Sequence, residues 1–378
     1  MIYFDNAATS FPKPRTVSQM LLEASLKYGG NPGRGGHAFS ASTGEQIYRA
    51  RETASAFFHT VPERVIFTNN CTSALNIAIK GIVKENGHIV ISDLEHNAVY
   101  RPVYNLKQKG IVEYTIVKTY DDDDSKTVDA FSEAIRSNTC LVVCTHASNV
   151  SGHVLPVDKI GALCKQKRIP FVIDAAQSAG VIPIDFSKTG ACVVCVPGHK
   201  GLYGPMGTGM LILYEDCFLQ TIFEGGTGSV SSEPEMPDFY PDRLEAGTLN
   251  TSGILALSKG ISFVCKKTPA RLFSYEESLC QFVRTHLEQM PNVVLCPQGK
   301  SHVSIVSFSV LAKHSEQTAE ALNRMGFALR GGLHCAPLAH AHYGTMENGL
   351  VRFAPSAFNT PEECRQFVNA VYRYQRAN

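Results

Sequence analysis

The chain reads FVIDAAQSAG over 171–180 and GHKGLYGP over 198–205. The first stretch opens with a short apolar run, which predicts a buried parallel strand that ends at Asp174. A second apolar run, 192–196, predicts another strand, and it leads directly to His199 and Lys200. Open α/β sheets bind ligands at the carboxyl ends of their strands, so we expect these side chains to meet at one edge of a sheet.

A carboxylate and an amine at such an edge are the groups that pyridoxal phosphate requires. The amine of Lys200 can hold the cofactor covalently, while the Asp174 carboxylate keeps the pyridine nitrogen protonated and makes the ring an electron sink. Either residue alone is better explained by a salt bridge or a solvated loop. The two motifs together predict a cofactor site.

Both motifs resemble those of the fold-type I pyridoxal-phosphate enzymes, in the class V aminotransferase branch that contains the cysteine desulfurases and selenocysteine lyases. The resemblance runs from DNAATS at 5–10 to RFAPSAFNT at 352–360. It implies an α/β fold with a mostly parallel central sheet flanked by helices and a smaller α/β C-terminal domain. We expect a large cofactor-binding domain over 15–255. Residues 1–14 and 256–378 would form a small domain that carries the catalytic cysteine loop.

The composition favours a globular protein that binds a small molecule. The chain has 378 residues, of which 44% are hydrophobic and 18% charged, enough for two domains and a large core. A net charge of +1 gives no electrostatic reason to bind nucleic acid or an anionic membrane. No apolar run approaches the roughly 20 residues of a membrane span. The chain also opens in a strand pattern without a basic leader, so we expect a cytoplasmic protein.

Apolar periodicity predicts further elements outside the two motifs. Among them are a helix over 42–58, a strand over 302–310 and a strand over 350–354. Four consecutive aspartates, 121–124, separate a predicted strand from a predicted helix. This run predicts a solvated loop rather than a metal site.

Twelve cysteines are present, and most of them lie in apolar segments, where free cysteine behaves as a small hydrophobic residue. A disulfide framework is not expected in a reducing compartment. Cys192 and Cys195 imitate half of a zinc site, but residues three apart on a strand point to opposite faces. Cys140 and Cys144 share a face but lie roughly 13 Å apart at about 3.3 Å per residue. We therefore predict no metal.

A phosphate site is predicted where TNNCTSAL, 68–75, turns from a strand into a helix. A helix N-terminus binds anions through its free backbone N–H groups, which favours the cofactor phosphate here, led by Thr72; ordinary helix capping is the alternative. Cys71 lies beside the helix dipole, which could lower its pKa, but the resemblance makes it a backbone position of the phosphate loop. The resemblance adds His199 as a phosphate ligand. It also makes Thr248, in EAGT at 245–248, a residue that crosses a homodimer interface to the phosphate of the other subunit.

The resemblance also assigns the side chains around the cofactor ring. His96, in the Glu95-His96 pair after a predicted strand, is expected to stack over the ring, although a single loop histidine is usually a surface residue. Gln177 is expected to contact the cofactor hydroxyl. Asn149, in HASNVSG at 146–152, is expected to reach both that hydroxyl and the substrate carboxylate.

Substrate binding is assigned chiefly to Arg352, which lies on the predicted strand 350–354. Its guanidinium is expected to hold the substrate carboxylate bidentately, with Asn149 assisting. Arg34 and His37 lie in the glycine-rich loop GGNPGRGGHAFS, 29–40. They match an arginine and a histidine that desulfurase-like enzymes carry beside the substrate pocket. A solvated loop explains these two residues about equally well.

The nucleophile is predicted from RGGLHCAP at 330–337, which resembles the signature of the compact group II desulfurases. By this resemblance Cys335 attacks the sulfur of L-cysteine, forms a persulfide and releases L-alanine, and a sulfur-acceptor protein could receive the sulfur. The flanking glycines Gly331 and Gly332 favour exposure of the thiol, and the neighbouring His334 is expected to favour its thiolate form.

Rival functions share most of these residues. A selenocysteine lyase acting on L-selenocysteine, or another class V lyase, would use every cofactor residue; Cys335 argues only against plain transamination. A cofactor-bound sulfur-docking or regulatory protein is the non-enzymatic alternative. Two positions depart from the family pattern: Pro197 stands where relatives offer a hydroxyl to the phosphate, and Leu333 where close desulfurases carry a second histidine.

Overall fold

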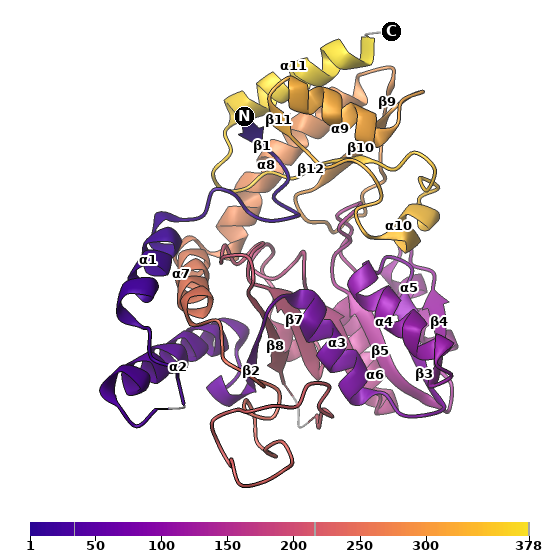
Figure 1. Ribbon diagram of the computed structural model, residues 1–378. Coiled ribbons are helices and arrows are strands. Elements are labelled where there is room, and N and C mark those ends of the chain that lie inside the picture. Colours follow the sequence, from indigo (N-terminus) through magenta and orange to yellow (C-terminus); the bar gives the residue numbers. More distant parts are fainter. Residues whose placement is uncertain (34, 215–216, 377–378) are drawn as a thin grey trace.

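The computed structural model describes residues 1–33, 35–214 and 217–376. Its larger body is built on a seven-stranded sheet with the strand order β2-β8-β7-β6-β5-β3-β4 (Figure 1). Only β8 runs antiparallel to its neighbours, so the predicted mostly parallel sheet is confirmed. The strands are β2 Val65–Thr68, β3 Gly87–Ser92, β4 Val112–Val117, β5 Thr139–Thr145, β6 Phe171–Asp174, β7 Val193–Pro197 and β8 Gly209–Leu213.

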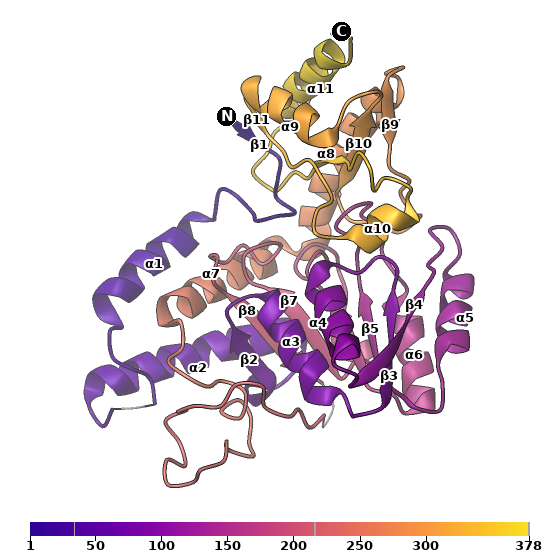
Figure 2. The same ribbon diagram turned by 45° about the vertical axis from the view of Figure 1, so that its right-hand side comes forward.

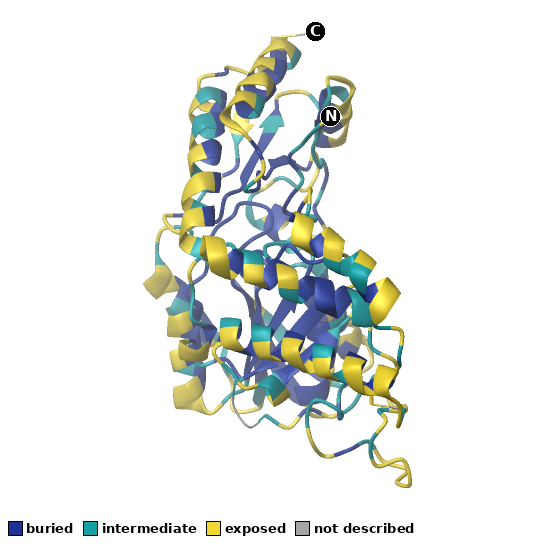
Figure 3. Cartoon of the chain, turned by 90° about the vertical axis from the view of Figure 1, so that its left-hand side faces the viewer, coloured by how far each residue is buried: buried dark blue, intermediate teal, exposed yellow. Residues whose placement is uncertain are grey.

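Helices cover both faces of this sheet, because the central strands are apolar on both sides. Along β5, Leu141 and Val143 pack in one core cluster with α3 and α4, whereas Val142 and Cys144 pack in another with α2, α5, α6 and α7. Figure 3 shows the buried sheet between helices whose outer faces are exposed. The helices are α1 Arg15–Lys27, α2 Ala38–Phe58, α3 Cys71–Ile82, α4 Asn97–Gln108, α5 Asp124–Ala134, α6 Val157–Lys167 and α7 Thr251–Lys267, with single 3₁₀ turns at Pro62–Arg64 and Phe186–Lys188.

A smaller body packs against the larger one and joins the two ends of the chain (Figures 1 and 2). Its strands are β9 Val293–Leu295, β10 Val306–Val310 and β12 Val351–Phe353 in one antiparallel sheet, and β1 Ile2–Tyr3 paired in parallel with β11 Phe327–Ala328. Its helices are α8 Pro269–Glu288, α9 Ser315–Arg324, α10 Pro337–His342 and α11 Pro361–Arg376. In the core of the smaller body, the ring centroids of Phe4 and Phe353 lie 4.4 Å apart. The predicted domain boundary at 255/256 falls within α7 and stays a prediction.

Several element boundaries differ from expectation. The strand predicted over 302–310 begins only at Val306, because His302 and Val303 pair with the loop around His153 instead. The helix predicted from residue 42 begins at Ala38, where the His37 side chain caps it. Elements β9 and α10 were not predicted; both are too short for a periodic pattern.

The two motifs that decide the fold touch through glycines. A Cβ added at Gly180 would lie 2.5 Å from the Gly201 carbonyl oxygen, and one added at Gly201 would lie 2.5 Å from the Ala179 carbonyl oxygen. Only hydrogen at both positions allows this approach. The contact fixes the segment after Asp174 against the segment that carries Lys200.

A long segment between β8 and α7 extends away from the larger body (Figures 1 and 2). It exposes several large apolar side chains, among them Phe218, Phe223 and Phe239, each at least half exposed. No helix in the described ranges is both long enough and apolar enough to cross a membrane.

Candidate active site

A cavity of about 230 Å³ opens at the carboxyl edge of the large sheet. Strands β2, β3, β5, β6 and β7 all end at this edge, as the sequence predicts for a parallel sheet. Many of the predicted site residues line it: Cys71, Thr72, His96, Asn149, Asp174, Gln177, His199, Lys200 and Arg352. Residues from across the whole chain therefore meet at one place.

Asp174 ends β6 with its side chain buried at the cavity. Its Oδ1 accepts a hydrogen bond from the Ala176 backbone N–H at 2.9 Å. Burial raises the pKa of Asp174, and the Ala176 hydrogen bond and the Lys200 charge oppose that rise. A cationic group beside a desolvated carboxylate favours its charged form, so Asp174 suits a protonated ring nitrogen.

The N-terminus of α3 borders the same cavity through Asn70, Cys71 and Thr72. Asn70 caps the helix by accepting a hydrogen bond from the Ser73 N–H at 2.9 Å. The preceding N–H groups of the first turn have no acceptor within the helix and can bind an anion. Gly209 of β8 makes room for this turn, since a Cβ there would lie 2.5 Å from the Asn70 carbonyl carbon.

The pKa of the Cys71 thiol is raised, whereas the helix dipole alone would lower it. Burial, followed by the Asp174 charge, raises the pKa of its thiol well above the ordinary value. The thiol donates a hydrogen bond to the Asp174 Oδ1, with 3.5 Å between sulfur and oxygen. The thiol is therefore protonated and is not a reactive nucleophile in this site.

Lys200 follows β7 and projects into the cavity from the edge that Asp174 shares. Burial, followed by the positive charge of Arg352, lowers the pKa of its amine, while Asp174 opposes that change. A lowered pKa increases the neutral fraction, which is the form that attacks a carbonyl carbon.

The N-terminal segment clasps the backbone before and at Lys200. The His199 carbonyl accepts hydrogen bonds from the Ser10 N–H at 3.0 Å, the Thr9 hydroxyl at 3.1 Å and the Lys13 amine at 2.8 Å. The Ser10 hydroxyl also donates to the Lys200 carbonyl at 3.0 Å. Residues 9–13 thus fix the main chain from which the reactive amine projects.

His96 is presented to the cavity by the turn after β3. Buried Glu95 holds this turn, because its Oε1 accepts hydrogen bonds from the Ser92 hydroxyl at 2.5 Å and from the Thr145 N–H at 2.8 Å. The His96 Nδ1 accepts from the Ala98 N–H at 3.0 Å. Burial, then the neighbouring cations with Lys200 first, lowers the pKa of His96 to about 4. The ring is therefore neutral at pH 7, as suits a ring that lies over an aromatic cofactor.

Arg352 is fully buried and held in one orientation. Its Nη2 lies 2.9 Å from the Asp5 carboxylate, and its Nη1 donates to the Asn149 carbonyl at 3.0 Å. Within the described ranges its Nε is buried without a hydrogen-bond partner. Asn149 itself donates to the His334 carbonyl at 2.8 Å, and Gln177 donates to the Ala7 carbonyl at 3.0 Å. The guanidinium is therefore oriented by Asp5 and retains donor capacity for a substrate.

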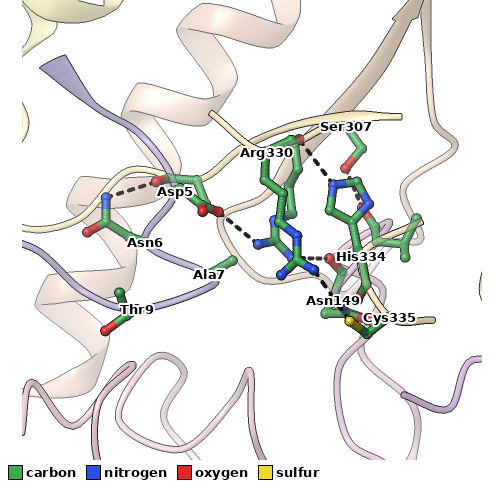
Figure 4. Close-up of polar contacts among 12 residues, drawn as sticks. Asp5, Asn6, Ala7, Thr9, Asn149, Ser307, Arg330, His334 and Cys335 are labelled. Carbon is green, nitrogen blue, oxygen red and sulfur yellow. Dashed lines mark hydrogen bonds and ion pairs between the residues drawn. The ribbon is translucent and has the colours of Figure 1, made fainter. Parts of the chain in front are cut away.

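Cys335 is exposed beside the cavity, as predicted. Arg330, which lines the cavity, donates from its Nη2 to the Cys335 sulfur at 3.4 Å (Figure 4). The flanking glycines serve packing rather than flexibility: a Cβ at Gly331 would lie 2.5 Å from the Ser315 carbonyl oxygen. The cation beside the nucleophile is therefore Arg330.

The predicted role of His334 is wrong. Its ring is buried and lies against the Arg330 backbone, with Nε2 3.2 Å from that carbonyl oxygen (Figure 4). Burial, followed by the Arg352 charge, lowers the pKa of His334 to about 2. A neutral imidazole supplies no positive charge to a neighbouring thiolate.

Two predicted residues, Thr248 and His37, do not line this cavity in their own chain. Thr248 is exposed and lines a separate depression with Ser73 and Asn250. His37 is exposed and caps α2, its Nδ1 accepting from the Ser40 N–H at 3.3 Å. Arg34 lies outside the described residues.

The residues present fit pyridoxal phosphate. The cavity combines a buried carboxylate, a partly buried lysine amine and a helix N-terminus. In the described chain the His199 Nδ1 is also buried without a hydrogen-bond partner, which leaves a polar atom for a ligand. Pro197 lines the same wall and offers no side-chain donor. Within this chain, the α3 turn and His199 are the groups at the cavity that could bind the phosphate.

Sequence reasoning assigned no role to Asp5, Glu95 or Arg330. Asp5 orients Arg352, Glu95 sets the turn before His96, and Arg330 contacts Cys335. All three lie within motifs that the sequence did single out. An ionisable residue inside a motif was the available signal, but its partner is distant in sequence.

Comparison with known proteins agrees with this geometry. The family model described as aminotransferase class-V matches residues 2–367. A probable cysteine desulfurase of Methanothermobacter thermautotrophicus is 29% identical, over 96% of this chain and 92% of its own length. The apo structure of a cysteine desulfurase from Thermococcus onnurineus NA1 superposes with a TM-score of 0.90 at 29% identity, covering 99% of this chain and 94% of that one.

The fold is also shared with the cysteine desulfurase CsdA from Escherichia coli, with a TM-score of 0.86 at 22% identity over 98% of this chain and 94% of that one. The predicted fold-type I architecture and the predicted pyridoxal-phosphate dependence are thereby confirmed. From the match over residues 2–367 it follows that the chain belongs to the class-V aminotransferase family.

Proposed function

We propose that the chain is a pyridoxal-phosphate-dependent cysteine desulfurase, which converts L-cysteine to L-alanine and leaves the sulfur as a persulfide on Cys335. One observation carries the proposal: an exposed thiol, in contact with Arg330, stands beside a cavity that holds Lys200 and Arg352. The similar proteins from Methanothermobacter thermautotrophicus and Thermococcus onnurineus, both named as cysteine desulfurases, agree with it.

Each side chain has a role that follows from its position. The cofactor, when bound, supplies an electron sink for the electron pair left on the substrate carbon. The residues that would hold it line the cavity: Thr72, the Cys71 backbone, His96, Asp174, Gln177 and His199. Lys200 anchors the cofactor and moves the proton at the substrate Cα. Arg352 and Asn149 bind the substrate carboxylate.

The sulfur step is assigned to Cys335. Its sulfur attacks the sulfur of L-cysteine, an S–S bond forms, and the C–S bond breaks with its electron pair passing to the substrate carbon. That carbon is then protonated to give L-alanine, so L-cysteine and the enzyme thiol become L-alanine and the enzyme persulfide. An added thiol reduces the persulfide and releases sulfide.

The direct test is anaerobic incubation of the purified protein with L-cysteine, pyridoxal phosphate and a reducing thiol. Sulfide and alanine are expected in equal amounts. Release of pyruvate in place of alanine, or no turnover of L-cysteine alongside rapid turnover of L-selenocysteine, would contradict the proposal.

Replacing Arg352 is expected to weaken substrate binding strongly. Loss of the bidentate contact should lower kcat/KM for L-cysteine by about 30- to 1000-fold, equivalent to about 2–4 kcal/mol. Arg352→Lys keeps a cation opposite Asp5 but loses the planar fork, so it separates this effect from unfolding. The exposed Arg365→Ala on α11 is the control. Near-normal kcat/KM in Arg352→Lys would require a different anchor.

The active unit is proposed to be a homodimer in which Thr248 completes the partner's phosphate site. Support comes from the position of Thr248 outside its own cavity and from the apolar side chains exposed on the segment after β8. Two-fold dimers are also the commonest assembly.

Subunit mixing tests this assignment. Lys200→Ala and Thr248→Ala chains are unfolded together and refolded, which yields mixed dimers. If Thr248 acts across the interface, the mixed dimer contains one intact site, and about half of the normal activity per dimer should return. Activity per dimer that is at or below the level of the Thr248→Ala homodimer would place Thr248 in its own subunit's site, because the mixed dimer would then hold only one impaired site. An active monomer would exclude the dimer.

The compartment and the sulfur acceptor belong to the same proposal. Buried cysteines such as Cys71, Cys144 and Cys195 are free thiols, which supports a reducing compartment such as the cytoplasm. An exposed persulfide on Cys335 would be accessible to an acceptor protein as well as to small thiols.

A further inference from the structure

The backbone at the proposed nucleophile is in an unusual conformation. His334 and Cys335 both have left-handed backbone angles, with φ of +50° and +56°. Residues other than glycine adopt this region rarely, and two in succession persist only when surrounding contacts impose them. The question is which contacts hold Cys335 in this turn.

Two contacts lie at the turn itself. The Asn97 N–H at the start of α4 donates to the Cys335 carbonyl at 2.7 Å, and the Asn149 side chain donates to the His334 carbonyl at 2.8 Å. Both donors belong to the larger body, whereas the turn arrives from the smaller one. The turn is therefore bound across the junction between the two bodies.

A second set of contacts lies at the far end of α10, the short helix that starts two residues after Cys335. The His342 Nδ1 lies 2.7 Å from the Asp93 Oδ2, and both side chains are more than four-fifths buried. The Tyr343 hydroxyl lies 2.9 Å from both the Asp121 Oδ1 and the Ser151 Oγ. Asp121 opens the acidic run 121–124, so this residue of the predicted solvated loop has a binding partner.

Asp93 is itself held in place for this contact. Its Oδ1 accepts hydrogen bonds from the Thr119 N–H at 3.1 Å and the Thr119 hydroxyl at 2.7 Å, which leaves Oδ2 for His342. Removing one partner of a largely buried ion pair leaves the other charge buried and unpaired, which costs more than breaking an exposed pair. In Figures 1 and 2, α10 lies directly over the larger body at this place.

We propose that the His342–Asp93 ion pair and the Tyr343 hydroxyl form a latch that docks α10 on the larger body and thereby fixes Cys335 beside the cavity. His342 and Tyr343 are positioning residues for the sulfur step. The expected effect on kcat rests on the proposed desulfurase function. The expected effect on the structure of the turn does not.

The structural consequence is measured by amide hydrogen exchange on the cofactor-loaded protein without substrate. In His342→Gln and Tyr343→Phe, exchange across 333–340 and at Asn97 should accelerate by about tenfold, because local opening becomes easier. The matched controls, exposed His314→Gln and Tyr372→Phe, should leave it unchanged. Unchanged exchange in both latch variants would overturn the proposal, whatever the parent protein catalyses.

The kinetic consequence separates positioning from general damage. Because the cofactor and substrate residues are untouched, both latch variants should keep the KM for L-cysteine and the cofactor absorbance change on adding it, while kcat for sulfide release falls about tenfold. Asp93→Asn keeps an oxygen acceptor for Thr119 but removes the ion pair. Combined with His342→Gln it should be no worse than either single variant, and additive losses would show that the two residues act separately.

The latch should also depend on pH. The hydrogen bond to Asp93 raises the pKa of His342, burial and Lys118 oppose it, and Asp121 adds to the rise; His153 faces the same region. A raised folded pKa means that the stabilisation is present at low pH and is lost as pH rises through that pKa. The protection of residues 333–340 from amide hydrogen exchange should therefore fall with rising pH in the parent protein. In His342→Gln this protection should not change with pH. Parallel profiles would contradict the ion-pair latch.

Discussion

Replacing Lys200 with alanine is expected to lower desulfuration of L-cysteine by at least about 1000-fold, because one side chain both anchors the cofactor and transfers the proton. Desolvation at the cavity lowers the pKa of its amine, and no other lysine lines the cavity among the described residues. The parent protein should be yellow. Borohydride reduction followed by mass spectrometry should place the cofactor on Lys200.

The matched control is Lys27→Ala, an exposed lysine of α1 that pairs with Glu23. It should keep full activity and colour. A reduced cofactor label that still maps to 198–205 in Lys200→Ala, or a label on another lysine in the parent, would show that the anchor is misassigned.

Replacing Cys335 with alanine should remove nearly all sulfide release, by at least about 100-fold, while the cofactor remains bound and still responds to L-cysteine. The reason is the order of events: Lys200 acts at the Cα before the sulfur is attacked. Turnover of L-selenocysteine should fall less, since selenium leaves more readily. The measurement pairs both rates with mass spectrometry of the persulfide trapped on the parent protein.

Cys265 provides the control, because its thiol is exposed like that of Cys335. Cys265→Ala should carry a full persulfide on Cys335 and release sulfide normally. A persulfide mapped to Cys71 or to any other cysteine would contradict the mechanism, as would unimpaired L-cysteine turnover in Cys335→Ala.

The sequence predicted those elements of the fold that have a continuous apolar run or that lead into a recognisable site motif. Buried strands such as β6 and β7 are continuous apolar runs, and the residues after them fall at the expected edge. The strand predicted over 302–310 was too long, because the alternation continues through residues whose partner is the loop at His153. Pairing partners are a tertiary property that periodicity does not contain.

The site was predictable in its membership but not in its electrostatics. The motif placed His334 next to Cys335, yet the left-handed turn directs the ring into the protein and leaves Arg330 at the sulfur. Likewise, the helix dipole at Cys71 is outweighed by burial and by Asp174. Sequence neighbours are not spatial neighbours at a strained turn, and burial decides the pKa of a group more strongly than its place on a helix.

The ion pair between Asp5 and Arg352 joins residues that are 347 positions apart, and β1 finds its partner only in β11. During synthesis on the ribosome, the carboxylate thus emerges long before the guanidinium that it orients. The clasp of residues 9–13 on His199 and Lys200 can close much earlier. The residues that one chain contributes to the cofactor half of the site are therefore all present in a nascent chain before Arg352 has been made. A chain that ends before Arg352 is expected to retain the cofactor-anchoring residues without the means to hold an amino acid.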